Sequence, residues 1–142
     1  MQKPTRAPIG LLLANTAKAL NRAFDDTLAA AGGSVPVWLI LITLKTQPRA
    51  SQREIAAAVG IQGATLTHHL NSMEKDGLIT RTRDPENRRV HQVRLTDKGE
   101  ETFHRLADAA RAHDQRLRAG FSEDDLETLE KLLTRMRANV TG

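Results

Sequence analysis

The sequence predicts a mainly α-helical fold with one small antiparallel β-hairpin. Two observations support this prediction. Apolar residues recur every three or four positions over long stretches, which is the period of an amphipathic helix. Between residues 78 and 96 the pattern changes to two short segments rich in β-branched residues around a turn-rich loop, which is typical of a hairpin. We therefore expect helical segments on both sides of one hairpin.

The first predicted helix covers residues 9–31. Its apolar positions fall at helical spacing: Ile9, Leu13, Ala17, Leu20, Phe24 and Leu28. Gly32 and Gly33 are expected to end it. Ser34 is a suitable N-cap for a second segment, residues 35–47, which is apolar on every side. Periodicity does not distinguish a strand from a helix there, but the neighbouring segments favour a central buried helix.

Two shorter helices are predicted next. Ser51 and Glu54 form a capping box, because each side chain can bind the backbone N–H of the other residue. The helix that follows is expected to end at Gly60. Another helix begins near Gly63, runs to Lys75 or Asp76, and is closed by Gly77.

The hairpin follows directly. Its strands read LITRTRD and VHQVRLT, and they flank the loop formed by residues 84–89. A long helix is then predicted from about Thr96 to Ala119, and a last helix is capped by Ser122 and Asp125. In the last helix an apolar seam alternates between spacings of three and four, as in a coiled coil: Leu126, Leu129, Leu133, Met136 and Val140.

Composition excludes several classes of protein. The 142 residues suit one domain with one core, and the absence of cysteine excludes disulfides and thiol chemistry. The longest uncharged apolar run, Val35–Leu44, is about half of what a membrane-spanning helix needs. With no convincing signal peptide, we expect a cytoplasmic protein without membrane contact. No catalytic motif is present, so we expect neither an enzyme nor a cofactor.

The positive charge is concentrated in one segment. The net charge is +4, and residues 78–96 carry five arginines against two acidic residues. The arginines are Arg81, Arg83, Arg88, Arg89 and Arg94. Such a segment favours a polyanionic partner. Aromatic residues make up only 3% of the chain, which argues against proteins that stack single-stranded bases on aromatic side chains.

The order of parts in residues 51–96 is that of a winged helix-turn-helix: a capped helix, a glycine turn, a second helix and a basic hairpin. On a helical wheel, Leu66, Leu70 and Met73 of the second helix fall on one side, which must face the core. The opposite side is small and polar: Ala64, Thr65, His68, Ser72 and Lys75, with Thr67 and Asn71 at its edge. A solvated surface is the alternative interpretation, but the low helix propensity of these residues favours a face chosen for contact with DNA.

The hairpin loop carries the second candidate contact. Arg88 and Arg89 lie near its tip, where arginines can enter the minor groove of DNA. Taken alone, a pair of loop arginines is more often merely solvated. The helix-turn-helix immediately before the loop favours a role in binding.

These residues resemble the MarR family of winged-helix regulators. The resemblance rests on S-x-x-E-I-A from Ser51, A-T-L-T from Ala64, L-x-x-M-E-K-D-G-L-I from Leu70, R-x-R-D-P-E-N-R-R from Arg81 and V-x-L-T-D-K-G from Val93. It implies one domain over residues 1–142, with dimerisation helices at 9–31 and 100–140 around a DNA-binding lobe at 34–96. It further implies a homodimer that represses transcription by binding pseudo-palindromic double-stranded DNA, and that responds to a small-molecule effector.

The expected site residues follow from the motif and the resemblance together. The expected DNA contacts are Ser51, Arg53, Gln62, Gly63, Thr65, Thr67, His68, Ser72, Arg83, Arg88 and Arg89. The expected dimer contacts are Ile9, Leu13, Leu126, Leu129, Leu133 and Met136. One position departs from the family pattern, since Asn87 stands where an aspartate is usual, and a charge partner for a nearby arginine is therefore lost.

Other functions fit the sequence less well. The sequence Gly60-Ile61-Gln62-Gly63 has the GxxG form of an RNA-binding clamp, but it lacks the basic residues usual between the glycines. His68 and His69 diverge by about 100° on a helix, so they are not expected to hold one metal ion. A winged-helix module that binds another protein and has no DNA site of its own remains the alternative from a different class.

Overall fold

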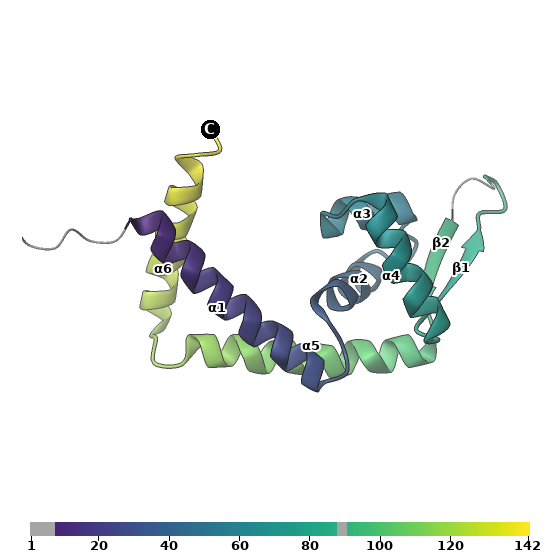
Figure 1. Ribbon diagram of the computed structural model, residues 1–142, viewed down its shortest axis with the longest axis horizontal. Coiled ribbons are helices and arrows are strands. Elements are labelled where there is room, and N and C mark those ends of the chain that lie inside the picture. The colour runs from purple at the N-terminus through teal and green to yellow at the C-terminus, as the bar shows by residue number, and fades with distance from the viewer. Residues whose placement is uncertain (1–7, 88–90) are drawn as a thin grey trace, which may run out of the picture. The chain divides into compact units, whose positions relative to one another are not determined.

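The computed structural model describes residues 8–87 and 91–142 (Figure 1), and the account below is confined to them. The chain divides into two compact units, Met1–Ala110 and Arg111–Gly142, which are described separately. Arg88 and Arg89 lie outside the described residues. The single domain expected from the sequence stays a prediction.

The first unit contains most of the predicted elements. In chain order they are α1 (Ile9–Ala30), α2 (Val35–Thr46), α3 (Gln52–Val59), α4 (Gly63–Lys75), β1 (Ile79–Arg83), β2 (His91–Leu95) and the first part of α5 (Asp97–Arg118). The mainly helical fold with a small antiparallel hairpin is confirmed.

Local chemistry explains where the helices begin and end. The Ser34 hydroxyl accepts a hydrogen bond from the Val37 N–H at 3.4 Å, so α2 is capped as expected. The capping box of α3 is present, with Glu54 N–H donating to Ser51 Oγ and Ser51 N–H donating to Glu54 Oε1, each at 3.2 Å. Gly60 has the left-handed φ of +78° that ends α3.

The core of the first unit lies between α2, α3, α4 and the hairpin. The segment α2 is a helix, and its buried side chains include Ile40, Leu41 and Leu44. The predicted inner face of α4 is also confirmed, since Leu66, Leu70 and Met73 are at most 2% exposed. The other fully buried side chains are Leu28, Ile55, Ile79, Val93 and Leu106.

The hairpin is held in register by pairs that run from Ile79 with Leu95 to Arg83 with His91. Val93 of β2 is buried, while the next residue, Arg94, is exposed, as the alternation of a strand requires. A single antiparallel β-bridge pairs Ser51, the residue just before α3, with Gln92 of β2.

One set of contacts joins the end of α4, the base of the hairpin and the start of α5. The Thr96 hydroxyl donates to the Gly77 carbonyl at 2.5 Å and accepts from the Gly99 N–H at 3.0 Å. The Thr96 N–H donates to the Leu78 carbonyl at 3.1 Å. We call the contact between residues 76–78 and residues 96–99 the junction.

Two further contacts tighten the junction. The Lys98 ammonium donates to the carbonyl of Asp76 at 2.8 Å, which places a cation at the C-terminal end of α4. A Cβ built on Gly99 would overlap the backbone carbonyl oxygen of Leu78. The backbone of α5 therefore lies directly against the residue that follows Gly77, and only glycine fits there.

The second unit contains the end of α5 and α6 (Glu123–Ala138). The predicted cap of α6 is confirmed: Ser122 and Asp125 bind each other's backbone N–H, both at 3.0 Å. Helix α6 has no buried residue. It ends at Ala138, so Val140, which the predicted seam included, lies beyond the helix and is 82% exposed.

No single helix among the described residues is long and apolar enough to cross a membrane. Helices α1 and α2 reach that length and composition only when taken as a pair, and they are bent by 76° at the break between them.

Replacing Gly99 by alanine should destabilise the fold. The added Cβ meets backbone rather than a movable side chain, so α5 must shift, and we expect a loss of about 2 kcal/mol or more in the free energy of unfolding. Urea denaturation followed by circular dichroism measures it. Gly63→Ala is the control, because nothing lies within 4 Å of a Cβ at that helical position. An equal effect of both substitutions would contradict the close packing at the junction.

Candidate nucleic-acid interface

The outward face of α4 is the centre of the candidate interface. Thr65, His68 and Ser72 are all exposed and follow one another at spacings of three and four residues. The core face of the same helix is formed by Leu66, Leu70 and Met73, which lie on the opposite side. The helix is thus amphipathic, and its outer stripe is small, polar and uncharged.

The N-terminal end of α4 is also accessible. Gln62 is the N-cap, but its side chain makes no capping hydrogen bond, and both Gln62 and Gly63 are exposed. Nothing lies within 4 Å of a Cβ placed on Gly63, so a partner can approach the backbone closely. The first N–H groups of a helix carry partial positive charge and suit a phosphate oxygen.

Thr67 is less free than its neighbours. Its hydroxyl donates to the carbonyl of Gly63 at 2.9 Å, one turn earlier in the helix. In this conformation the hydroxyl can accept a hydrogen bond from a partner but does not donate one. Thr67 therefore contributes less to the polar stripe than the helical wheel suggested.

Two predicted contacts lie at the start of α3. The Ser51 hydroxyl oxygen is occupied by the capping box, so its main role in the free protein is to hold the first turn of α3. Arg53 is exposed and forms no ion pair with any described residue. Its charge is available to an anionic partner.

The hairpin supplies a further cation at its far end. Arg83 is the last residue of β1, is exposed, and takes part in no ion pair within residues 8–87 and 91–142. The turn that follows is ordered by Asp84, whose carboxylate accepts from the Glu86 N–H at 2.9 Å. Arg88 and Arg89, the predicted tip contacts, belong to the part of the loop that is not described.

Arg81 has a different role from the other arginines of the basic segment. Its guanidinium donates to Asn71 Oδ1 at 2.5 Å and to Glu74 Oε1 at 2.9 Å, so β1 is tied to α4. The Arg81 side chain is only 18% exposed. From the sequence, Arg81 was one of the five arginines of the basic segment, with no partner assigned to it. A signal was nevertheless present, since Asn71 and Glu74 are spaced to lie on one edge of α4.

The contact with Arg81 shifts the pKa of the Glu74 carboxyl. The hydrogen bond and the positive charge of Arg81 hold the pKa of Glu74 below its ordinary value of 4.5, although partial desolvation opposes the shift. The ionised form is therefore the one that binds Arg81.

The predicted dimer contacts lie on apolar surfaces that are open in the single chain. On α1, Ile9 is 61% and Leu13 is 40% exposed. On α6, Leu129 is 46% exposed, while the other seam residues, Leu126, Leu133 and Met136, are partly buried. Each helix thus presents an apolar face to solvent within its own unit.

The described residues contain no group of three or more His, Cys, Asp or Glu side chains that could hold a metal ion. The imidazole rings of His68 and His69 contact each other edge to face, with centroids 5.8 Å apart.

Low pH should weaken the ion pair between Arg81 of β1 and Glu74 of α4. Because the pKa of Glu74 is lowered by folding, its stabilising effect is complete above the ordinary pKa of 4.5 and is lost as the pH falls through the lowered value. We expect the wild type to melt at a higher temperature than Glu74→Gln at pH 7, and this difference to shrink below about pH 4. A difference that stays constant down to pH 2 would contradict the assignment.

One family model and several known proteins match this chain. Residues 34–91 match the model of the MarR family. The uncharacterised HTH-type transcriptional regulator YdgJ of Bacillus subtilis is 33% identical over 92 residues. That alignment covers 65% of this chain and 56% of the relative, so only about half of the relative's length is matched.

Solved structures match over nearly the whole chain. The transcriptional repressor CouR, bound to a 23-mer DNA duplex, superposes with a TM-score of 0.82 at 29% identity, covering 92% of both chains. A probable transcriptional regulator from Pseudomonas aeruginosa gives a TM-score of 0.77 at 27% identity, covering 91% of this chain and 96% of that one. Over its helix-turn-helix and hairpin, which the family model matches, this chain is similar to the MarR family of transcriptional regulators.

Proposed function

We propose that this protein is a cytoplasmic, homodimeric transcriptional repressor that binds pseudo-palindromic double-stranded DNA and is released by a small-molecule effector. The observation that carries the proposal is the exposed polar stripe of α4, which lies inside the region matched to the MarR family, residues 34–91. The family is one of regulators, and we propose no catalytic role.

The stripe of α4 suits the major groove. The groove is about 12 Å wide and admits one helix, provided that the side chains facing the bases are not bulky. Thr65 and Ser72 can each donate or accept a hydrogen bond, and the imidazole of His68 can do either according to its tautomer. These three side chains would read base edges, while the backbone at Gly63 would approach a phosphate.

Arginines outside α4 would supply affinity. Arg53 and Arg83 are exposed and form no ion pair with a described residue, so each can neutralise a DNA phosphate. We place Arg88 and Arg89 in the minor groove on sequence grounds. Such contacts release counterions and give an affinity that falls steeply with salt.

The exposed apolar faces of α1 and α6 support the homodimer. Among the described residues ten large hydrophobic side chains are exposed, most of them on these two helices, and exposed apolar surface of this kind marks an interface. A two-fold dimer would place two α4 helices about 34 Å apart, one turn of DNA. The 23-mer bound to CouR is long enough for two such half-sites.

The last part of the proposed function is a response to an effector. Its support is an aromatic pair between α2 and α5: Trp38 and Phe103 stack with centroids 5.6 Å apart, and both are only partly buried. A ligand that packed against this pair would shift α5 against the lobe and so change the spacing of the two α4 helices.

Substitutions at the interface should separate sequence reading from affinity. We expect His68→Ala to alter the preference among duplexes by about 1–3 kcal/mol per contacted base pair. The double substitution Arg88→Ala, Arg89→Ala should weaken binding to all duplexes alike and flatten the salt dependence. Gel-shift titrations with duplexes selected from random sequence measure both effects.

The same titrations test the proposal against the alternative. If neither the wild type nor any variant binds a selected duplex, DNA binding is wrong, and a winged-helix module for protein partners becomes the better interpretation. Lys131→Gln, on an exposed surface of α6, is the control and should behave as wild type.

A charge on the seam of α6 should dissociate the dimer. Leu129→Glu would bury an unpaired carboxylate, which costs well over the ~1.4 kcal/mol that corresponds to a tenfold change in dissociation constant. Thr128→Glu is the matched control, since it adds the same charge one residue away and off the seam. Sedimentation equilibrium should show monomer for the first variant and dimer for the second. Equal behaviour would rule out α6 as the interface.

A further inference from the structure

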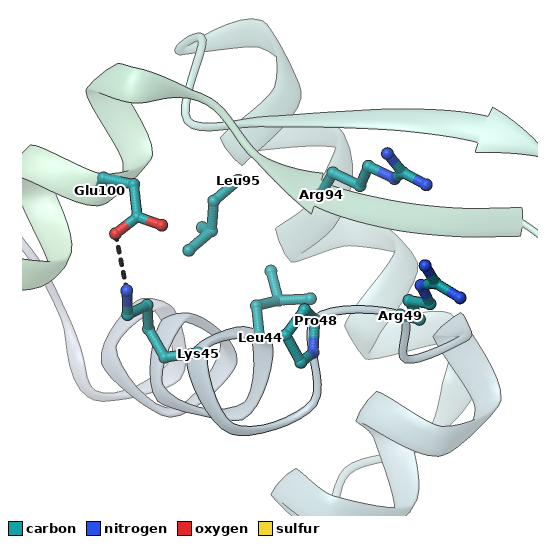
Figure 2. Close-up of a pocket in the computed structure, with 7 residues that line it drawn as sticks. All are labelled: Leu44, Lys45, Pro48, Arg49, Arg94, Leu95 and Glu100. Atoms are coloured by element: carbon teal, nitrogen blue, oxygen red, sulfur yellow. Dashed lines mark hydrogen bonds and ion pairs between the residues drawn. The ribbon is translucent and has the colours of Figure 1, made fainter.

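A cavity of about 300 Å³ lies between the end of α2, the strand β2 and the first turn of α5, away from the stripe of α4 (Figure 2). Its floor is apolar and is formed by Leu44, Pro48 and Leu95. Charged side chains line the rest of it, and they fall into two groups.

The first group is neutral as a whole. Lys45 and Glu100 form an ion pair at 2.9 Å on one side of the cavity. The second group is cationic. Figure 2 shows Arg49 and Arg94 with their guanidinium groups extending to the same side, away from the Lys45–Glu100 pair. Both arginines are exposed, and neither side chain has a hydrogen-bond or ion-pair partner among the described residues.

The fold itself brings the two arginines together. Ser51 is bridged to Gln92, with the two chains antiparallel. Arg49 lies two residues before Ser51 and Arg94 two residues after Gln92, so both lie on the same side of this bridge. Like charges opposite each other across antiparallel chains are unfavourable.

No nearby acid relieves this repulsion. Among the described residues that line the cavity, Glu100 is the only one with a carboxylate, and it is bound to Lys45. Glu54 lines a neighbouring hollow together with Arg49, but its carboxylate accepts from the Ser51 N–H in the capping box. Two adjacent guanidinium groups therefore face solvent without a counter-charge from the described part of the chain.

We propose that Arg49 and Arg94 together bind one phosphate of the DNA backbone, a contact outside the stripe of α4 and outside the hairpin loop. This inference rests on the proposed function. An arginine fork matches the geometry of a phosphate, and two forks on one phosphate remove the mutual repulsion. Arg49 lies close in the chain to Ser51 and Arg53 at the start of α3, two of the residues expected to contact DNA.

The alternative occupant is a small anion held in the cavity. The direction of the side chains favours DNA, because both guanidinium groups extend outward and leave the apolar floor uncovered (Figure 2). A phosphate contact of this kind carries no sequence information, so it adds equally to specific and non-specific binding.

The experiment compares Arg49→Gln, Arg94→Gln and the double variant with wild type, on a selected duplex and on a scrambled one, at several salt concentrations. Each single substitution should weaken both complexes by about fivefold near 0.15 M salt and lower the magnitude of the salt slope by less than about 0.9, the value for one lost phosphate contact, because the other arginine still reaches the phosphate. Because the phosphate is shared, the double variant should lower the slope by about 0.9 and not by twice that amount. Arg137→Gln on α6 is the control.

A second measurement separates binding from folding. Without DNA, Arg94→Gln should melt at the wild-type temperature or above it, since a like charge has been removed. If the wild type binds the duplexes and the Arg49 and Arg94 variants bind them with the same affinity and the same salt slope, this inference is wrong and the proposed function stands. If the substitutions instead abolish only a thermal shift caused by inorganic phosphate, the cavity binds a small anion and the inference is wrong. Wild-type protein that binds neither duplex would overturn the proposed function and this inference with it.

Discussion

The contact between residues 76–78 and 96–99 is the constraint on which the DNA-binding lobe depends. Thr96 hydrogen-bonds to both sides of it, and Gly99 lets the backbone of α5 reach the carbonyl of Leu78. The end of α4, the open ends of both strands and the first turn of α5 therefore meet within a few residues. Since each of these bonds has a backbone group as at least one partner, the junction fixes the directions of the backbone, and the exposed residues of α4 take their orientation from it.

Arg81 provides a second fixed point on the same helix. Its bonds to Asn71 and Glu74 hold β1 along the C-terminal half of α4, while the junction holds the end of that helix. A helix attached at two places cannot rotate about its own axis without breaking one of them. The side chains that face outward are thus presented at a defined angle, and the interface is organised before any partner arrives.

Much of this architecture could be predicted from short-range patterns. The capping boxes at Ser51 and Ser122 and the buried face of α4 depend on residues three or four positions apart, so the sequence displays them directly. The role of Arg81 could not be assigned in the same way, because its partners lie ten and seven residues away in another element. The proximity of Arg49 and Arg94 was hidden for the same reason. It depends on a single bridge between segments 41 residues apart, Ser51 and Gln92, which no local pattern encodes.

The absence of buried side chains from α6 has a consequence for how the protein exists at low concentration. A helix of 16 residues is marginal in water on its own, and the i,i+4 pair of Glu127 and Lys131 adds only a few tenths of a kcal/mol. In the proposed homodimer, order in this segment would come largely from association, which obeys mass action. The concentration of the protein in the cell would then set the fraction of chains whose C-terminal helix is ordered. A fall in total concentration would therefore reduce the concentration of chains with an ordered α6 by a larger factor.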